Sequence, residues 1–368
     1  AYEKSGRLLD VVSSCFYNLT SANTSEEMQE LQMKITPKMS EYSTSIMLNE
    51  KLFSRIKTVY ESRSKLKLTQ EQSKMLEDIY EGFANNGANL QGKDRETFKE
   101  LNTKLSNLTT QFGQNALRAT NAWSMLIQDE KLLEGLNDDT KSMLKEKAKA
   151  KGKEGFLLDL QPTTITPVLQ DCDNRYIRRE LHMAYNKVAL GGEYDNSQVI
   201  IDIVNTRLSL AKLFEKKCYA DKALDKRMAE NKENVYKMLD QLRDAYKSAA
   251  HNEMAELQQF AEEKGFYAQL MPWDFGYYSK KLKNEKYSIS DDILRPYFEL
   301  ENVKKGVFGL ANRLYGITFK ENKSIPVYHP EVSAYEVYDA KGKFLAVYYC
   351  DFHPRESKRA GAWMNDFQ

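Results

Sequence analysis

Two long stretches of the sequence repeat apolar side chains at steps of three and four residues, and this spacing constrains the fold more than any other feature. An α-helix has about 3.6 residues per turn, so apolar residues at these steps line one helical face. The pattern predicts a long amphipathic helix over residues 92–128 and another over residues 231–264. In the first stretch the apolar set is Phe98, Leu101, Leu105, Leu108, Phe112 and Leu117, and in the second it is Val235, Met238, Leu239, Leu242, Tyr246, Ala249, Leu257 and Phe260.

Other local signals place the ends of helices. Asn231 can cap the second long helix because its side chain accepts a hydrogen bond from a free backbone N–H, and Gly265 can end that helix. Capping boxes predict two further helix starts, at Thr24 with Glu27 and at Thr69 with Gln72. The fold class expected from these signals is mainly α.

The period of the sequence changes near residue 316. Residues 335–338 and 344–349 are short runs of β-branched and aromatic residues, separated by a polar stretch that ends in Gly342. This arrangement predicts a small β-hairpin near the C-terminus. A charged, Gly-containing stretch at 151–155 precedes two prolines and indicates a boundary. We therefore expect three regions, namely a helical region over 1–155, a second helical region over 156–316 and a region over 317–368 that contains the hairpin.

Composition excludes several classes of protein. The 54 basic and 53 acidic side chains give a net charge of only +1, so bulk charge offers no support for binding to nucleic acid or to an anionic membrane. No run approaches the roughly 18 apolar residues of a membrane span. The cysteines are scattered without a CxxC pair, which predicts free thiols rather than a disulfide framework or a cysteine zinc site. They are Cys15, Cys172, Cys218 and Cys350.

The sequence contains no complete catalytic motif. None of its four histidines has a second histidine four residues away, so the helical HExxH zinc motif is absent. The nearest group with the chemistry of metal ligands is Asp351 with His353 and His329, on strand and loop ends. Such residues more often form ordinary polar surface, and we expect neither a metal site nor catalytic residues in this chain. No nucleophile elbow or phosphate-binding loop is present either.

The densest segment follows the hairpin, at residues 351–363, where alternating charges are mixed with small residues and one Trp. In one interpretation, a bridge between Asp351 and Arg355 ties down a loop and Gly361 allows a tight turn. In the other, residues 360–363 form a binding rim whose small side chains leave a backbone edge open to an extended peptide.

Several motifs in one order carry a resemblance that covers nearly the whole chain. The most specific are residues 325–332, followed by the hairpin and then by Asp351-x3-Arg355-x2-Lys358-x2-Gly361-Ala362-Trp363. Further matching segments are 16–19, 90–121, 207–213, 227–229, 273–274, 277–278, 295–298 and 306–308. With these motifs the sequence resembles the thimet-oligopeptidase family of zinc peptidases (M3), most closely its bacterial peptidyl-dipeptidase (dipeptidyl carboxypeptidase) branch.

The resemblance implies a helical, two-lobed architecture with a deep channel that admits short, unfolded peptides. At the channel floor a zinc ion activates water and a glutamate acts as base, and the branch releases dipeptides from the carboxyl end. The HExxH helix, the third zinc ligand and the tyrosines of the family would lie beyond residue 368. We therefore expect an inactive N-terminal part of a metallopeptidase, truncated just after the start of its catalytic domain, with zinc bound only in the full-length protein.

The resemblance also implies roles for residues of this chain. The backbone of Gly361, Ala362 and Trp363 would pair with extended substrate, and Asp351, Arg355 and Lys358 would shape the floor beside it. Aromatic side chains are commonly buried in a core, so four residues are expected to pack between helices rather than touch substrate: Trp273, Asp274, Tyr277 and Tyr278. The full-length protein would be a cytoplasmic monomer, with the periplasm as the alternative compartment. The alternative function is a stand-alone, non-catalytic helical protein that binds peptides or acts as a scaffold through the hairpin edge.

Overall fold

The computed structural model describes residues 5–288 and 291–367. Helices dominate these residues and the sheets are small and antiparallel, which confirms the mainly α prediction. The chain divides into two compact units, each built from separate stretches: Ala1–Ser25, Thr120–Lys187 and Ala250–Gln368 in the first unit, Glu26–Ala119 and Val188–Ala249 in the second. These units follow contacts in space rather than order along the chain, and the boundaries expected after residues 155 and 316 stay predictions.

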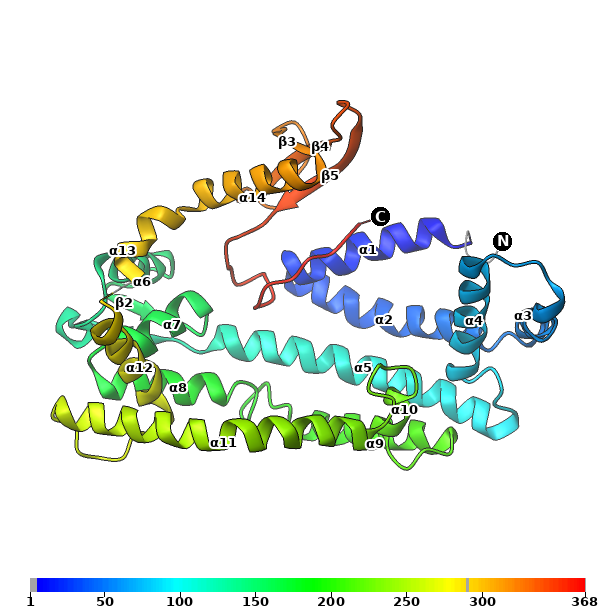
Figure 1. Cartoon of the computed structure of the whole chain (residues 1–368), viewed down its shortest axis with the longest axis horizontal. Helices are drawn as coiled ribbons and strands as arrows, with labels where there is room; N and C mark the ends of the chain where they lie inside the picture. The colour runs from blue at the N-terminus through cyan, green and yellow to red at the C-terminus, as the bar shows by residue number, and fades with distance from the viewer. Residues whose placement is uncertain (1–4, 289–290, 368) are drawn as a thin grey trace. The chain divides into compact units, whose positions relative to one another are not determined.

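The first unit contains most of the short helices and all of the strands (Figure 1). Its helices are α1 (Arg7–Ala22), η2 (Glu130–Leu133), α6 (Asp138–Ala150), α7 (Pro162–Asp171), α8 (Arg175–Asn186), α12 (Pro272–Tyr287), α13 (Asp291–Leu294), η3 (Arg295–Phe298) and α14 (Leu300–Tyr315). Its strands are β1 (Met125–Ile127), β2 (Phe156–Leu158), β3 (Thr318–Glu321), β4 (Ser333–Tyr338) and β5 (Phe344–Cys350).

The second unit is entirely helical over the residues that the structure describes. Two long helices, α5 and α11, begin in this unit and end in the first one. The core of the unit gathers Leu48, Phe98 and Leu210, with Phe214 packed against them. Its elements are α2 (Glu26–Met47), α3 (Glu50–Glu61), η1 (Arg63–Lys65), α4 (Gln70–Asn85), α5 (Gly92–Ala122), α9 (Ser197–Leu213), α10 (Tyr219–Leu224) and α11 (Lys232–Glu263).

The capping signals are confirmed at two of the three helix starts. Thr69 and Gln72 form the reciprocal pair of a capping box at the start of α4. The Asn231 side chain accepts a hydrogen bond from the N–H of Asn234 at 2.8 Å, in the first turn of α11. The prediction at Thr24 is wrong by one residue, because α2 begins at Glu26 and the Thr24 N–H donates instead to the carbonyl of Ser357 at 2.8 Å.

The long helix predicted over residues 92–128 is confirmed only as far as Ala122. Residues 125–127 form strand β1, which pairs antiparallel with β2. Gly155 makes this pairing possible: its φ is +103°, and a Cβ there would lie 2.5 Å from the carbonyl oxygen of Ile127. The extended stretch is therefore selected by a partner distant in the sequence, and a helical pattern on its own cannot reveal that partner.

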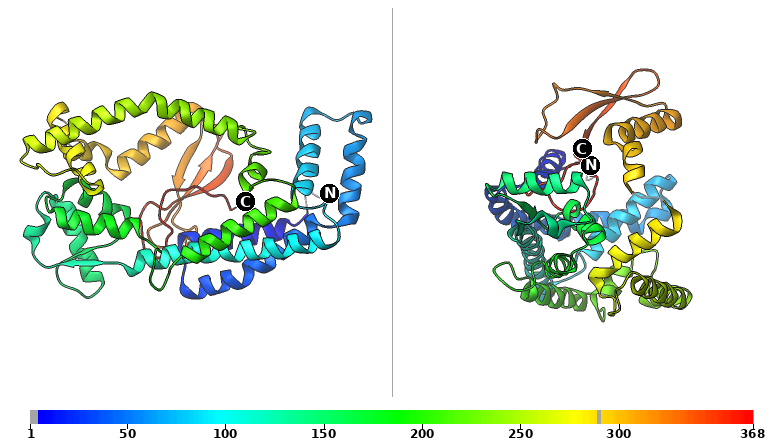
Figure 2. Two further views of the ribbon diagram at one scale, coloured as in Figure 1. Left: turned by 90° about the horizontal axis from the view of Figure 1, so that it is seen from below. Right: turned by 90° about the vertical axis from the view of Figure 1, so that its left-hand side faces the viewer.

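The predicted hairpin is confirmed as β4 and β5, and β3 adds a third strand that the sequence pattern did not indicate. Helix α14 lies along this sheet, as two further views also show (Figure 2). Phe308 of α14 stacks on Phe319 with ring centroids 4.1 Å apart and meets the ring of Tyr335 edge-on at 5.1 Å. Over the described residues, no helix is both long enough and apolar enough to span a membrane.

Candidate peptide-binding rim

Asp351 directly follows β5 and receives three side chains on its carboxylate. Both terminal nitrogens of Arg355 donate to it at 2.8 Å, and the hydroxyl of Tyr328 donates to Oδ2 at 2.9 Å. Lys358 Nζ lies 3.0 Å from Oδ1. The planar guanidinium matches both carboxylate oxygens at once, which makes this pair geometrically specific. We call Asp351, Arg355, Lys358 and Tyr328 the Asp351 cluster.

The electrostatics of the cluster favour the ionised carboxylate. Burial alone would raise the pKa of Asp351, but the hydrogen bonds from Arg355, Lys358 and Tyr328 outweigh it and lower the pKa to about 2. Burial and the hydrogen bond to Asp351 raise the pKa of Tyr328 to about 12. Both groups therefore keep one protonation state at neutral pH, and the cluster has the character of a fixed brace rather than of a proton-transfer pair.

The Asp351 cluster also holds the turn between α1 and α2. Arg355 Nη2 donates to the carbonyl of Ala22 at 2.5 Å. The N–H of Arg359 donates to the carbonyl of Ser21 at 2.8 Å, and the side chain of Asn23 donates to the carbonyl of Tyr328 at 3.1 Å. The loop after β5 is thus fastened at several points to a segment more than three hundred residues earlier in the chain, beside the end of α1 (Figure 1).

The rim segment, residues 360–363, follows this brace. Gly361 has a φ of +102°, a backbone conformation that residues with a Cβ rarely adopt. Residues 360–362 are exposed, and Trp363 is half-buried beneath Arg359, whose guanidinium lies 4.7 Å from the ring centroid. Among residues 5–288 and 291–367, no backbone hydrogen bond to another backbone group involves the rim segment. The Arg359 N–H, directly before the segment, is held by the carbonyl of Ser21, while residues 360–362 are exposed.

The structure brings three of the predicted site residues into direct contact and leaves others exposed nearby. Asp351, Arg355 and Lys358 meet in one cluster, as the structural interpretation of the segment requires, and Gly361 and Ala362 lie exposed beside them. Tyr328 was missed as a member, although it lies in the 325–332 motif. The carbonyl of Ala22 was also missed, and no sequence signal marks it because backbone acceptors are common to all residues.

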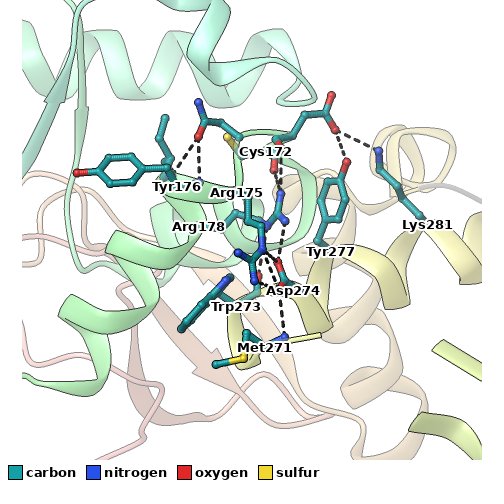
Figure 3. Close-up of polar contacts among 12 residues, drawn as sticks. Cys172, Arg175, Tyr176, Arg178, Met271, Trp273, Asp274, Tyr277 and Lys281 are labelled. Carbon is teal, nitrogen blue, oxygen red and sulfur yellow. Dashed lines mark hydrogen bonds and ion pairs between the residues drawn. The ribbon is translucent and has the colours of Figure 1, made fainter. Parts of the chain in front are cut away.

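A second polar cluster lies between α8 and α12 (Figure 3). Arg175 and Arg178 converge on the carboxylate of Asp274, with Nη2–Oδ distances of 2.8 and 3.0 Å. Asp274 is fully buried and Arg178 is 2% exposed. We call these three residues the Asp274 cluster. It joins two helices that are about one hundred residues apart in the sequence.

Each charge of the Asp274 cluster is compensated. Burial alone would raise the pKa of Asp274, but hydrogen bonds from Arg175, the Met271 N–H and Arg178 hold that pKa below its ordinary value. Arg178 also donates to the carbonyl of Cys172 at 2.8 Å. Tyr277 is buried in the same region, and its hydroxyl donates to Asp173 at 2.6 Å. Asp274, Tyr277 and Tyr278 are buried and Trp273 is half-buried, which agrees with their expected packing between helices.

The residues that the structure describes do not fit a zinc ion. Over the described parts of the chain, no group of three or more His, Cys, Asp or Glu side chains is placed to hold a metal. Asp351 is satisfied by its three partners. His329 Nδ1 accepts the N–H of Glu331 at 3.3 Å and lies 3.7 Å from the Oε2 atom of the same residue.

Both clusters lie in a part of the chain that resembles known proteins clearly. The model of peptidase family M3 matches residues 168–368, a stretch that holds both clusters and is more than half of the chain. The chain belongs to peptidase family M3. The resemblance drawn from the sequence is confirmed at this level.

The relatives that this chain matches include bacterial and plant proteins. It is 36% identical to oligopeptidase A of Escherichia coli (strain K12), over 98% of this chain and 53% of that relative. It is 34% identical to dipeptidyl carboxypeptidase of the same organism, over 100% and 54% of the two chains. Probable cytosolic oligopeptidase A of Arabidopsis thaliana is 30% identical, over 97% and 52%. The M3 chain therefore spans about half the length of the curated relatives it matches.

Proposed function

We propose that the complete protein containing this chain is a zinc metallopeptidase that hydrolyses short, unfolded peptides and releases dipeptides from their carboxyl end. Membership of peptidase family M3 carries the proposal. The name of the E. coli dipeptidyl carboxypeptidase supports the dipeptide product. The zinc ligands would lie outside residues 1–368, so we assign no catalytic residue to this chain and expect it to be inactive alone.

We also propose that the rim segment binds substrate through its backbone. An extended peptide can pair with free N–H and C=O groups as an added strand. Three observations support this role: the exposure of residues 360–362, their small side chains and the absence of backbone partners over the described residues. Asp351, Arg355 and Lys358 would then be positioning residues, which hold the rim segment without contacting the peptide.

The cleavage mode is tested by identifying products. The complete gene product is incubated with a peptide of about ten residues, long enough to occupy an extended site, and the products are followed by mass spectrometry. Successive loss of dipeptides from the carboxyl end is expected. Cleavage only at internal bonds would refute dipeptide release while leaving a peptidase.

The rim is tested by enlarging one of its small side chains. Ala362→Leu places a bulky group where the peptide backbone would approach, and we expect KM to rise about tenfold, or roughly 1.4 kcal/mol. Because residue 362 is exposed, the thermal midpoint should stay unchanged. Ala268→Leu, at another exposed alanine of the same unit, is the matched control. An unchanged KM in Ala362→Leu would show that the rim segment does not bind substrate.

We propose a cytoplasmic monomer that acts on peptides and has neither nucleic acid nor membrane as a partner. The plant relative named as probable cytosolic oligopeptidase A supports the compartment. Cell fractionation and sedimentation of the complete protein test these points. Recovery of the protein in the periplasmic fraction would select the alternative compartment.

A further inference from the structure

Helix α14 has two apolar stripes, and only one of them is covered. Phe308 and Lys304 face the sheet, where Phe308 stacks on Phe319 and the Lys304 ammonium lies 5.4 Å from the ring centroid of Tyr335. A second stripe, which we call the α14 seam, runs along the neighbouring face of the helix. Its members and their exposed fractions are Leu300 38%, Val303 39%, Val307 58%, Leu310 54% and Leu314 63%.

The spacing of the α14 seam fits a helix as its partner. Its residues follow one another at steps of three and four along the whole helix, the a and d pattern through which two helices interlock side chains. Gly306 flanks the seam, and a Cβ at that position would meet nothing within 4 Å. A partner helix could therefore approach closely on that side. A partner strand or loop would not match a 3.5-residue repeat, because side chains alternate with a period of two in a strand and have no regular period in a loop.

The exposure of the seam needs a cause, because soluble proteins seldom leave a contiguous apolar stripe to water. The sheet of this unit already occupies the other stripe. The match to E. coli oligopeptidase A covers 98% of this chain but only 53% of that relative. A length of polypeptide comparable to this chain therefore lies outside the match in the relative. Such a length of polypeptide could cover the α14 seam without any second protein.

We infer that the α14 seam docks an amphipathic helix from the part of the full-length polypeptide outside residues 1–368. The inference rests on the proposed function only in requiring a full-length peptidase of this family. The docked helix would present its own apolar stripe to Val303, Val307 and Leu310. It would fix α14, and with it the sheet that leads into the rim segment, against the rest of the enzyme.

Cysteine labelling of the complete gene product tests the inference. Val307→Cys places a thiol in the seam with little change in volume, and Lys305→Cys places one two residues away, on the opposite face of α14. Each thiol is reacted with a maleimide under native conditions and located by peptide mass spectrometry, which separates it from the native cysteines. We expect residue 307 to react at least about tenfold more slowly than residue 305, since a docked thiol reacts only after local opening. Leu310→Cys repeats the test if Val307→Cys does not fold.

Equal labelling rates at 305 and 307 in the complete protein would overturn the inference. Protection that appears only at concentrations where sedimentation shows a dimer would also overturn it, because a second copy would then be the occupant. Peptide hydrolysis by the unsubstituted protein is measured in parallel. If the protein hydrolyses peptide while residue 307 is unprotected, only the docking inference is refuted. If residue 307 is protected but no peptide is hydrolysed, only the proposed function is refuted.

Discussion

At the scale of single residues, the account depends on Asp351, whose carboxylate is shared by Arg355, Lys358 and Tyr328. Its side chain is 11% exposed, so the charges interact with little screening by solvent. A carboxylate in such a place stabilises the fold only while it is ionised. The cluster therefore links stability to pH and fixes the loop that carries the rim segment.

Asp351→Asn should lower the free energy of unfolding by about 2 kcal/mol at neutral pH. The amide cannot compensate the charges of Arg355 and Lys358, which then repel each other. Because the folded pKa of about 2 lies below the ordinary aspartate value of 3.8, the stabilisation is complete above pH 3.8 and is lost as the pH falls towards 2. Denaturant unfolding of both proteins across this window measures the difference.

Asp366→Asn is the control for this prediction, since Asp366 is exposed on the same C-terminal segment and should change stability little. A difference between Asp351→Asn and the unsubstituted protein that did not shrink below pH 3.8 would contradict the assigned role of the carboxylate.

At the scale of elements, the Asp274 cluster joins α8 to α12 through a buried ion pair. Removing one partner of a buried pair leaves the other charge uncompensated, which costs about 3–5 kcal/mol. Asp274→Asn should therefore lower the free energy of unfolding by about this amount. Asp240→Asn, at an exposed bridge to Arg243 on α11, should cost less than about 1 kcal/mol. Equal effects of the two substitutions in thermal unfolding would argue against a buried network.

The pairing of β1 with β2 gives a second prediction at this scale. Gly155→Ala should lower the free energy of unfolding by about 1–3 kcal/mol, because the new Cβ combines a strained φ with a collision against the Ile127 carbonyl. Gly152→Ala meets only the strained φ, since nothing lies within 4 Å of its Cβ position. Chemical denaturation of both variants separates the two causes. Equal losses would show that the close approach to Ile127 contributes nothing.

Helices could be predicted from the sequence wherever the signal was local. The capping box at Thr69 and the cap at Asn231 depend on residues within one turn, and both are found. The end of α5 could not be predicted, because it depends on a strand partner at residues 156–158. The candidate site divides in the same way: the Asp351–Arg355 bridge is local and was foreseen, whereas the contact of Arg355 with Ala22 depends on the folded chain.

At the scale of the whole molecule, the chain belongs to peptidase family M3 and spans about half the length of the curated relatives it matches. The first unit carries the rim segment, the Asp351 cluster that braces it and the α14 seam. None of these provides a nucleophile or a metal centre. In the proposed enzyme their shared role would be to present and support a substrate-binding edge, while residues outside this chain would perform the chemistry.

The central claim is most directly tested by peptide hydrolysis with the complete gene product, measured with and without a zinc chelator. The account predicts hydrolysis of a short peptide, loss of activity in the chelator and recovery when zinc is restored. Peptide binding without hydrolysis, unaffected by the chelator, would contradict the account and identify a non-catalytic peptide-binding protein instead.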